Sequence, residues 1–397
     1  MLLSKLLLSI VFISMGGVHT SGVHGDPEEH MNAYQLITSK GYPAQDHWVT
    51  TEDGYILGLQ RIPYGLNSKT RTSLPVVLLQ HGILGSSADW LTNLANESLA
   101  YILANAGWDV WLGNIRGNIY SRNHTSLKPS QKEFWNFSFD EHALKDLPAM
   151  VNYILSVTGK TQLSYVGHSQ GTTMGFAGFS TLPDLADKVN LFVALAPVAT
   201  VHHIKGAVSF IAGYYKELDF LFTLFGDGEF LPDDDFNKIL ANVVCPLPGV
   251  DEICGNLLFL VCGFDEKNMN FSRLPVYAAH TPAGTSVKDI VHYGQEVKSG
   301  KFCMYDYGTA SANKAHYGQA TPPNYDVTKM TVATATFSGG NDWVADPTDV
   351  SELLPKLPHH VYHHNIDYYE HLDFIWGLDA NVKLYPRVID ELNKYKV

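Results

Sequence analysis

Segments of strand character alternate with segments of helical character along much of this chain. The strand-like runs, rich in apolar and β-branched residues, are residues 75–80, 108–112, 163–166, 191–195, 331–337 and 360–366. Helical patterns lie between them, at residues 91–103 and from Ser138 onward, and a helix over residues 380–396 closes the chain. Because strands buried on both faces read as nearly continuous apolar runs, this rhythm predicts a mostly parallel sheet with helices on both faces.

Local signals refine this outline. The Asp53-Gly54 turn lies between two strand-like runs and predicts a β-hairpin. Ser138 followed by Glu141 is a capping-box pattern, and Phe137 is placed to pack on the first helical turn as a hydrophobic staple. Pro148 falls within the same helical pattern, and we expect it to kink the helix because it has no N–H.

The strand–helix rhythm stops after about residue 200. Residues 201–320 contain an aromatic-rich stretch and an acidic run at residues 233–235, without clean alternation. We therefore expect an α/β core made of residues 23–200 and 321–397, with a cap domain inserted at residues 201–320. Its aromatic stretch is either a lid over the site or ordinary cap core.

The N-terminus carries the features of a secretory signal peptide. Lys5 precedes an apolar run at residues 6–15, and small residues follow. We assign residues 1–22 to this peptide. The run is too short to span a bilayer and no other segment is apolar enough, so we expect no transmembrane segment. In a secreted chain four N-x-S/T sequons are candidate glycosylation sites: Asn96, Asn123, Asn136 and Asn270.

Charge and cysteine spacing exclude some classes of protein. The formal net charge of −13 argues against nucleic acid as a partner. The cysteines form no C-x-x-C pair, so we expect no zinc site. In an oxidising compartment four cysteines permit a disulfide, and their sequence positions leave three full pairings open. They are Cys245, Cys254, Cys262 and Cys303.

Residues 167–171 read Gly-His-Ser-Gln-Gly and fit the pattern G-x-S-x-G. A strand-like run precedes them and a helix-compatible segment follows, which is the order of a nucleophile elbow in α/β-hydrolases. The two glycines would permit the strained turn and the close packing of helix on strand. Ser169 is therefore the candidate nucleophile.

A serine nucleophile needs a histidine to take its proton and a carboxylate to orient that histidine. In this fold the chain order is Ser, acid, His. Asp342 follows a late strand and a glycine turn, and Asp346 competes with it. His371 lies after the last strand and is the candidate base. The histidines at residues 359–364 are expected to be packed or solvated, and no acidic or cysteine ligand is spaced with them for a metal.

The third requirement is an oxyanion hole, two N–H groups directed at the developing negative charge. Gln170, the residue after the nucleophile, would supply one. The loop that follows the strand at residues 75–80 would supply the other, from Ile83 or alternatively Leu84. We expect His81 to brace this loop and not to transfer protons.

With these residues assigned, the chain resembles the acid lipase family, the group that includes gastric lipase and lysosomal acid lipase. The resemblance extends from about residue 28 to the C-terminus. It depends on long motifs at residues 51–57, 109–114, 166–173, 194–199, 282–287 and 371–377. Residues 254–260 and 376–380 are more similar to the lysosomal member than to the gastric one.

The resemblance implies the α/β-hydrolase fold with an inserted cap and lid, and a triad of Ser169, Asp342 and His371. It also implies a disulfide between Cys245 and Cys254. Cys262 would then be a free thiol, and Cys303 departs from the family pattern without an assigned role.

The implied function is cofactor-free hydrolysis of neutral-lipid esters, triacylglycerols or cholesteryl esters, at a lipid–water interface and at acidic pH. We expect a monomer that enters the secretory pathway and ends in lysosomes or outside the cell. Two alternatives stay open. One is a narrower esterase of the same family, acting on retinyl, wax or skin lipid esters; the other is a non-catalytic lipid-binding protein with the same fold.

Overall fold

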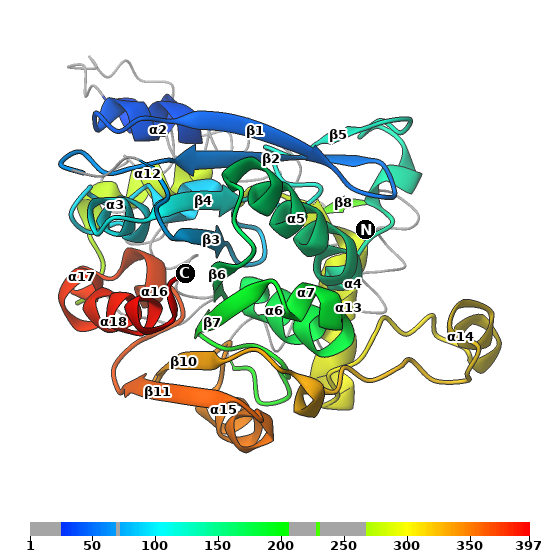
Figure 1. Cartoon of the computed structure of the whole chain (residues 1–397). Helices are drawn as coiled ribbons and strands as arrows, with labels where there is room; N and C mark the ends of the chain where they lie inside the picture. The colour runs from blue at the N-terminus through cyan, green and yellow to red at the C-terminus, as the bar shows by residue number, and fades with distance from the viewer. Residues whose placement is uncertain (1–24, 69–71, 206–227, 231–266) are drawn as a thin grey trace, which may run out of the picture.

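The computed structural model describes residues 25–68, 72–205, 228–230 and 267–397 (Figure 1). Its centre is a nine-stranded sheet with the order β1-β2-β4-β3-β6-β7-β10-β11, and β5 pairs with β2 beside this path. The strands are β1 (Gln45–Thr50), β2 (Tyr55–Ile62), β3 (Val76–Gln80), β4 (Asp109–Gly113), β5 (Asn123–His124), β6 (Leu163–His168), β7 (Val189–Leu195), β10 (Thr334–Gly339) and β11 (His360–Ile366).

Six neighbouring strands, from β4 to β11 in the sheet order, run parallel, whereas β1 and β2 form an antiparallel edge. Strands β3, β4 and β6 are buried along their whole length. Helices must cover both faces of such strands, because their side chains point alternately to either side. The predicted mostly parallel α/β sheet is confirmed.

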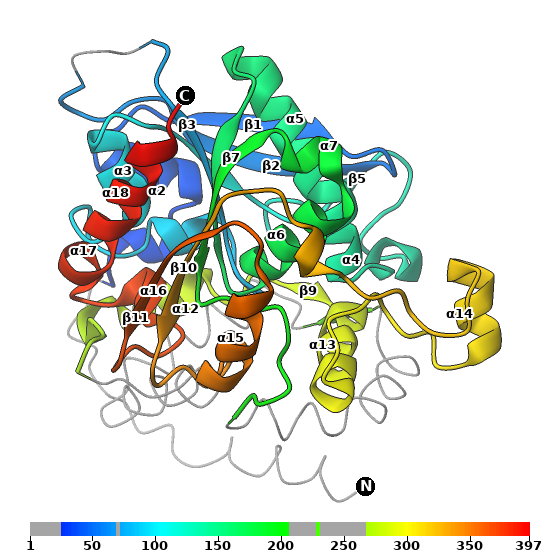
Figure 2. The same ribbon diagram turned by 60° about the horizontal axis from the view of Figure 1, so that its bottom comes forward.

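Each face of the sheet has its own hydrophobic core. Both views place the two helix groups on opposite sides of the sheet (Figures 1 and 2). One group consists of α2 (Ala33–Ser39), α3 (Leu99–Asn105), α16 (Asp373–Trp376), α17 (Ala380–Lys383) and α18 (Tyr385–Tyr395). The other consists of α4 (Phe139–Glu141), the π-helical turn η4 (His142–Asp146), α5 (Leu147–Thr158), α6 (Gln170–Thr181) and α7 (Pro183–Ala186).

The described part of residues 201–320, the predicted cap, contains a second, two-stranded sheet and several helices. These elements are β8 (Glu229–Phe230), β9 (Thr285–Ser286), α12 (Leu274–His280), α13 (Val287–Ser299) and α14 (Ala310–Tyr317). Helix α14 projects from the body on an extended arm (Figures 1 and 2). Apart from residues 228–230, the proposed lid lies outside the described residues, as do Cys245, Cys254, Cys262 and the signal peptide, so the division into core and cap stays a prediction.

The remaining described elements are α15 (Pro347–Leu353) and six short 3-10 helices: η1 (Pro27–His30), η2 (Ser87–Trp90), η3 (Lys132–Trp135), η6 (Phe271–Arg273), η7 (Val327–Lys329) and η8 (Leu354–Lys356). Within the described ranges no helix has the length and apolar character needed to cross a membrane.

Several local predictions are confirmed. Strands β1 and β2 form the expected hairpin, with Thr50 opposite Ile56. Ser138 and Glu141 form both halves of a capping box at α4. The ring of Phe137 lies 5.3 Å from that of His142, the fourth helical residue, as a staple requires.

Three helix boundaries differ from the predictions. The helix expected over residues 91–103 begins only at Leu99, because the Asn93 side chain accepts from the Leu94 N–H and holds a turn there. The helix expected over residues 380–396 is two helices, and Pro386 occupies the first turn of the second one. Pro148 lies in the first turn of α5 and does not kink the middle of a longer helix. The irregularity is instead the π-helical turn η4, which ends just before α5 begins.

Candidate active site

The turn between β6 and α6 presents Ser169 with strained backbone angles. Its φ is 54° and its ψ is −119°, values that residues with a side chain rarely adopt. Close packing accompanies this turn: a Cβ on Gly171 would lie 2.4 Å from the Gln80 carbonyl oxygen, and one on Gly167 would lie 2.5 Å from that of Gly171. Both glycines are therefore required for the helix to approach the sheet.

Three residues that are distant in sequence form a continuous hydrogen-bonded chain. His371 Nε2 lies 2.8 Å from Ser169 Oγ, and His371 Nδ1 lies 2.9 Å and 3.0 Å from the two carboxylate oxygens of Asp342. All three side chains are buried. The arrangement has the geometry of a nucleophile, a base and an orienting acid.

The loop after β10 fixes the position of Asp342. Asp342 Oδ1 accepts from the backbone N–H groups of Val344 and Ala345, both at 2.9 Å. Gly339 allows this loop to approach the histidine loop, because a Cβ there would lie 2.3 Å from the Tyr369 carbonyl oxygen. The competing acid, Asp346, instead caps α15 and forms an ion pair with Lys205.

His168, the residue before Ser169, also contributes to the site, which sequence reasoning missed. Its Nε2 lies 2.9 Å from the backbone oxygen of His371, and its ring lies 4.9 Å from the His371 ring. Burial, together with the charge of His371, lowers the pKa of His168 to about 3. A neutral imidazole here can donate Nε2–H and hold the histidine loop in place.

The two loops proposed for the oxyanion hole meet at Ser169. A Cβ on Gly82 would lie 3.0 Å from Ser169 Cβ, so the loop after β3 approaches the nucleophile closely. Ile83 and Leu84 follow, both half-buried, and Leu84 has a left-handed φ of 59°. Gln170 is the first residue of α6, and the N–H groups of a first helical turn have no acceptor within the helix.

The His81 side chain bonds to its own loop and to the neighbouring one. Its Nδ1 lies 2.7 Å from the Gly82 oxygen, and its Nε2 lies 3.2 Å from the side-chain nitrogen of Asn118. Burial lowers the pKa of His81 to about 4. These contacts fit the expected bracing of the loop.

The histidines of β11 lie elsewhere. His360 Nε2 and His363 Nδ1 are 2.8 Å and 2.9 Å from the Thr336 hydroxyl. Over the part of the chain that the structure describes, no three His, Cys, Asp or Glu side chains gather as metal ligands.

The sequons lie at the surface to different degrees. Asn96, Asn123 and Asn136 are exposed and Asn270 is half-buried. Ser138, the third residue of the Asn136 sequon, is fully buried and caps α4. Cys303 is a half-buried free thiol, and burial raises its pKa to about 12.

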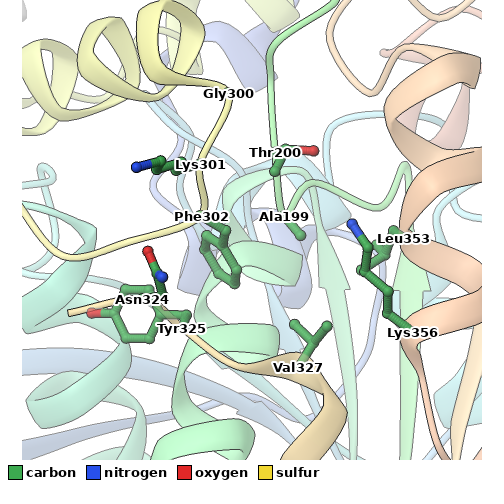
Figure 3. A pocket seen from close by; sticks show the side chains of 10 residues that line it. All are labelled: Ala199, Thr200, Gly300, Lys301, Phe302, Asn324, Tyr325, Val327, Leu353 and Lys356. Atoms are coloured by element: carbon green, nitrogen blue, oxygen red, sulfur yellow. The ribbon is translucent and has the colours of Figure 1, made fainter. Parts of the chain in front are cut away.

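A separate pocket of about 250 Å³ opens between the loop after β7 and residues 300–302 (Figure 3). Its floor is apolar, with Phe302 and Val327, and the Lys301 side chain points away from it. None of its lining residues belongs to the hydrogen-bonded chain of Ser169. The pocket therefore does not help to define the candidate active site.

Comparison with known proteins agrees with the fold and the motifs. A family model for the alpha/beta hydrolase fold matches residues 75–378, and one for a partial alpha/beta-hydrolase lipase region matches residues 33–94. The chain is 49% identical over 393 residues to the lysosomal acid lipase/cholesteryl ester hydrolase of Homo sapiens, covering 98% of each. It is 51% identical over 373 residues to the gastric triacylglycerol lipase of Homo sapiens, covering 94% of this chain and 93% of that protein.

Solved structures are similar at the level of the fold. A soluble variant of monoglyceride lipase from Saccharomyces cerevisiae superposes with a TM-score of 0.54 at 13% identity, covering 90% of this chain and 96% of that one. This likeness supports the α/β-hydrolase architecture and carries no information on substrate.

Proposed function

The chain belongs to the acid lipase family of α/β-hydrolases, and from this premise we propose that it hydrolyses triacylglycerols, cholesteryl esters or both to free fatty acids. Its relatives' names support the coarser statement that it is a lipase, a carboxylic ester hydrolase. The observation that carries the proposed hydrolysis is the hydrogen-bonded chain from Ser169 Oγ through His371 to Asp342, and the relatives' names supply the two substrate classes.

In the proposed mechanism Ser169 Oγ attacks the ester carbonyl carbon while His371 Nε2 takes its proton. The tetrahedral intermediate collapses when His371 gives that proton to the leaving alcohol, and an acyl-enzyme forms. Water then attacks the acyl group with His371 again as base, which releases the fatty acid and restores Ser169. Asp342 holds the imidazole in the required orientation and stabilises its charged form.

The negative charge on the carbonyl oxygen would be stabilised by the N–H groups of Gln170 and Ile83. The close approach of Gly82 to Ser169 supports this assignment. Such donors contribute only when they are fixed before the charge develops. We include no metal or organic cofactor in the reaction.

We further propose that the protein acts at acidic pH, in lysosomes or outside the cell, after its signal peptide is removed. The lysosomal and gastric relatives support this route. The four sequons would then carry glycans, and Cys245 and Cys254 would form a disulfide.

The deciding experiment measures hydrolysis of trioleoylglycerol and cholesteryl oleate by the purified protein at pH 5 and pH 7, with Ser169→Ala as the control. We expect release of oleate from at least one ester at pH 5 and none from the variant. Hydrolysis of both esters would define the substrate range as that of a combined lipase and sterol esterase.

Activity on neither ester would contradict the proposal. A panel of retinyl, wax and short-chain esters would then separate a narrower esterase from a lipid-binding protein that has lost hydrolysis altogether.

A further inference from the structure

A buried polar cluster joins the nucleophile elbow to the inserted region. Gln170 Nε2 lies 2.9 Å from Asp289 Oδ2 and 3.0 Å from His142 Nδ1. An amide nitrogen has two hydrogens, so Gln170 can donate to both partners at once. Thr285 Oγ1 donates to the same Asp289 oxygen at 2.9 Å.

The members of this cluster come from three parts of the fold. Gln170 begins α6, His142 begins the π-helical turn, and Asp289 lies in the first turn of α13. All are almost completely buried, with exposures of 1% for Gln170 and 0% for His142 and Asp289. Gln170 Oε1 and His142 Nε2 have no hydrogen-bond partner among the described residues, so the two bonds of Gln170 Nε2 are the ones that hold its side chain. At this depth losing either of them would leave a further polar group unpaired, which is costly.

Contacts of Phe137 and Ser286 hold the cluster where the core meets α13. The Phe137 ring contacts His142, and the Phe137 carbonyl accepts from Ser286 Oγ at 2.5 Å. Ser286 in turn caps α13 by accepting from the Asp289 N–H at 3.0 Å. Asp289 is therefore fixed to the core at its backbone as well as at its carboxylate.

Asp289 has no cationic partner among these contacts. Burial raises its pKa to about 7, although the donors Gln170 and Thr285 act in the opposite direction. Burial also keeps the pKa of His142 well below its usual value, so this neighbour is neutral. A buried carboxyl without a counter-ion depends on its hydrogen bonds for its position, and these bonds in turn restrain the Gln170 side chain.

Restraining the Gln170 side chain also affects its backbone N–H. Its backbone N–H is the proposed oxyanion donor, and its side chain extends from the same Cα. Ser169 before it has a left-handed φ of 54°, so regular helix geometry does not determine the orientation of the peptide between them. The side-chain amide, held by Asp289, is an additional constraint on that orientation.

We propose that Asp289 is a positioning residue for the hydrolysis: it fixes the Gln170 side chain and thereby aims the Gln170 N–H at the oxyanion. The inference rests on the proposed function. It also means that the inserted region, through α13, contributes to catalysis as well as to any covering of the site.

The test compares Asp289→Ala, Asp289→Asn and a matched control, Asp140→Asn, with 4-nitrophenyl butyrate as a soluble substrate. Asp140 is a similarly buried carboxyl in α4 that accepts from Tyr325 and Tyr305 and does not contact Gln170. Active sites are counted with a fluorophosphonate that labels Ser169, so kcat refers to folded enzyme only. A merely structural role would reduce the number of labelled sites and not kcat.

We expect Asp289→Ala to lower kcat per labelled site by about tenfold to a hundredfold with KM little changed, since small displacements of an oxyanion donor have effects of this size. Asp289→Asn keeps an oxygen acceptor for the Gln170 amide and should recover most of the loss. Asp140→Asn should stay within about twofold of the wild type.

A double-variant cycle with Gln170→Leu, which keeps the backbone N–H, isolates the route of the effect. If Asp289 acts through the Gln170 side chain, adding Asp289→Ala to Gln170→Leu lowers kcat by less than about twofold further. Unchanged kcat in Asp289→Ala, or effects that multiply in the double variant, would overturn the inference. A wild-type protein that labels with the probe but hydrolyses no ester would instead refute the proposed function.

Discussion

At the scale of single residues, His168 holds the loop of the proposed base. Its Nε2 is 2.9 Å from the His371 backbone oxygen, and its lowered pKa, about 3, leaves the ring neutral at acidic pH. We expect His168→Phe to lower kcat about fivefold with KM unchanged, because a buried hydrogen bond contributes about 1 kcal/mol. His363→Phe is the control, because it removes a β11 imidazole that bonds to Thr336 on β10. Equal kcat values for the two variants in a 4-nitrophenyl butyrate assay would contradict this assignment.

The raised pKa of Asp289 makes the stability of the folded protein depend on pH. Burial raises this pKa from 3.8 to about 7, so between these values the folded chain keeps a proton that the unfolded chain has lost. Stability from this group is therefore complete below about pH 4 and is lost as the pH rises to about 7, by at most about 1.4 kcal/mol per pH unit. Asparagine does not ionise, so Asp289→Asn should gain stability relative to the wild type across this window. Urea unfolding of both proteins at pH 4.5 and pH 7.5 measures the change, and a constant difference would refute it.

Sequence reasoning found some site residues and missed others for a physical reason. Ser169, Asp342 and His371 each follow a strand, and the carboxyl ends of parallel strands meet at one edge of a sheet, so chain order sufficed to bring them together. His168 and Asp289 act on partners 203 and 119 residues away. Asp289 looks in the sequence like an ordinary helix-capping acid, because it follows the helix cap Ser286 by three residues.

Among the secondary-structure elements, α4 allows the stability contributed by its Ser138 cap to be measured separately from any effect of glycosylation at Asn136. Ser138 is both the cap of this helix and the third residue of the Asn136 sequon. Ser138→Ala removes the cap and any glycan, whereas Asn136→Gln removes any glycan and leaves the cap in place; it also alters an exposed contact with Lys288. We expect Ser138→Ala to be less stable than Asn136→Gln by about 1 kcal/mol, the usual worth of a serine cap. Thermal unfolding of both proteins measures the difference, and equal melting temperatures would show that the cap contributes nothing.

Sequence patterns located the central strands more accurately than they located the start of α3. The apolar runs located β3, β4, β6 and β7 within a few residues, because burial on both faces leaves a continuous signal. The helix expected over residues 91–103 begins late, because Asn93 bonds to the backbone and also reaches the Trp376 carbonyl oxygen, a tertiary contact. Side chains that bond locally compete with helix hydrogen bonds, and periodicity alone does not show which prevails.

Across the fold as a whole, a buried ion-pair cluster connects residues 26–28 to the segment that leads into α12. Arg273, the last residue of η6, is 4% exposed and lies 2.7 Å from Asp26 and 2.5 Å from Glu28. Its Nε also donates to the Thr92 carbonyl oxygen at 3.0 Å. The cluster therefore joins three segments of the chain: residues 26–28, the loop at Thr92 and the residues just before α12.

Removing the two carboxylates alone should destabilise the protein more than removing them together with Arg273. Asp26→Asn with Glu28→Gln leaves Arg273 buried without an anion, and we expect this double variant to lower the free energy of unfolding by about 3 kcal/mol. Arg273→Ala should cost less, because Glu28 keeps its ion pair with Lys40 and Asp26 is partly exposed. The triple variant Asp26→Asn, Glu28→Gln and Arg273→Met removes the buried arginine with its two anions and should be more stable than the double variant. Lys329→Ala breaks an exposed pair with Asp326 and should have almost no effect. If urea unfolding finds the triple variant the least stable of the set, the cluster stabilises the fold through the attraction of its charges and not merely through their mutual compensation.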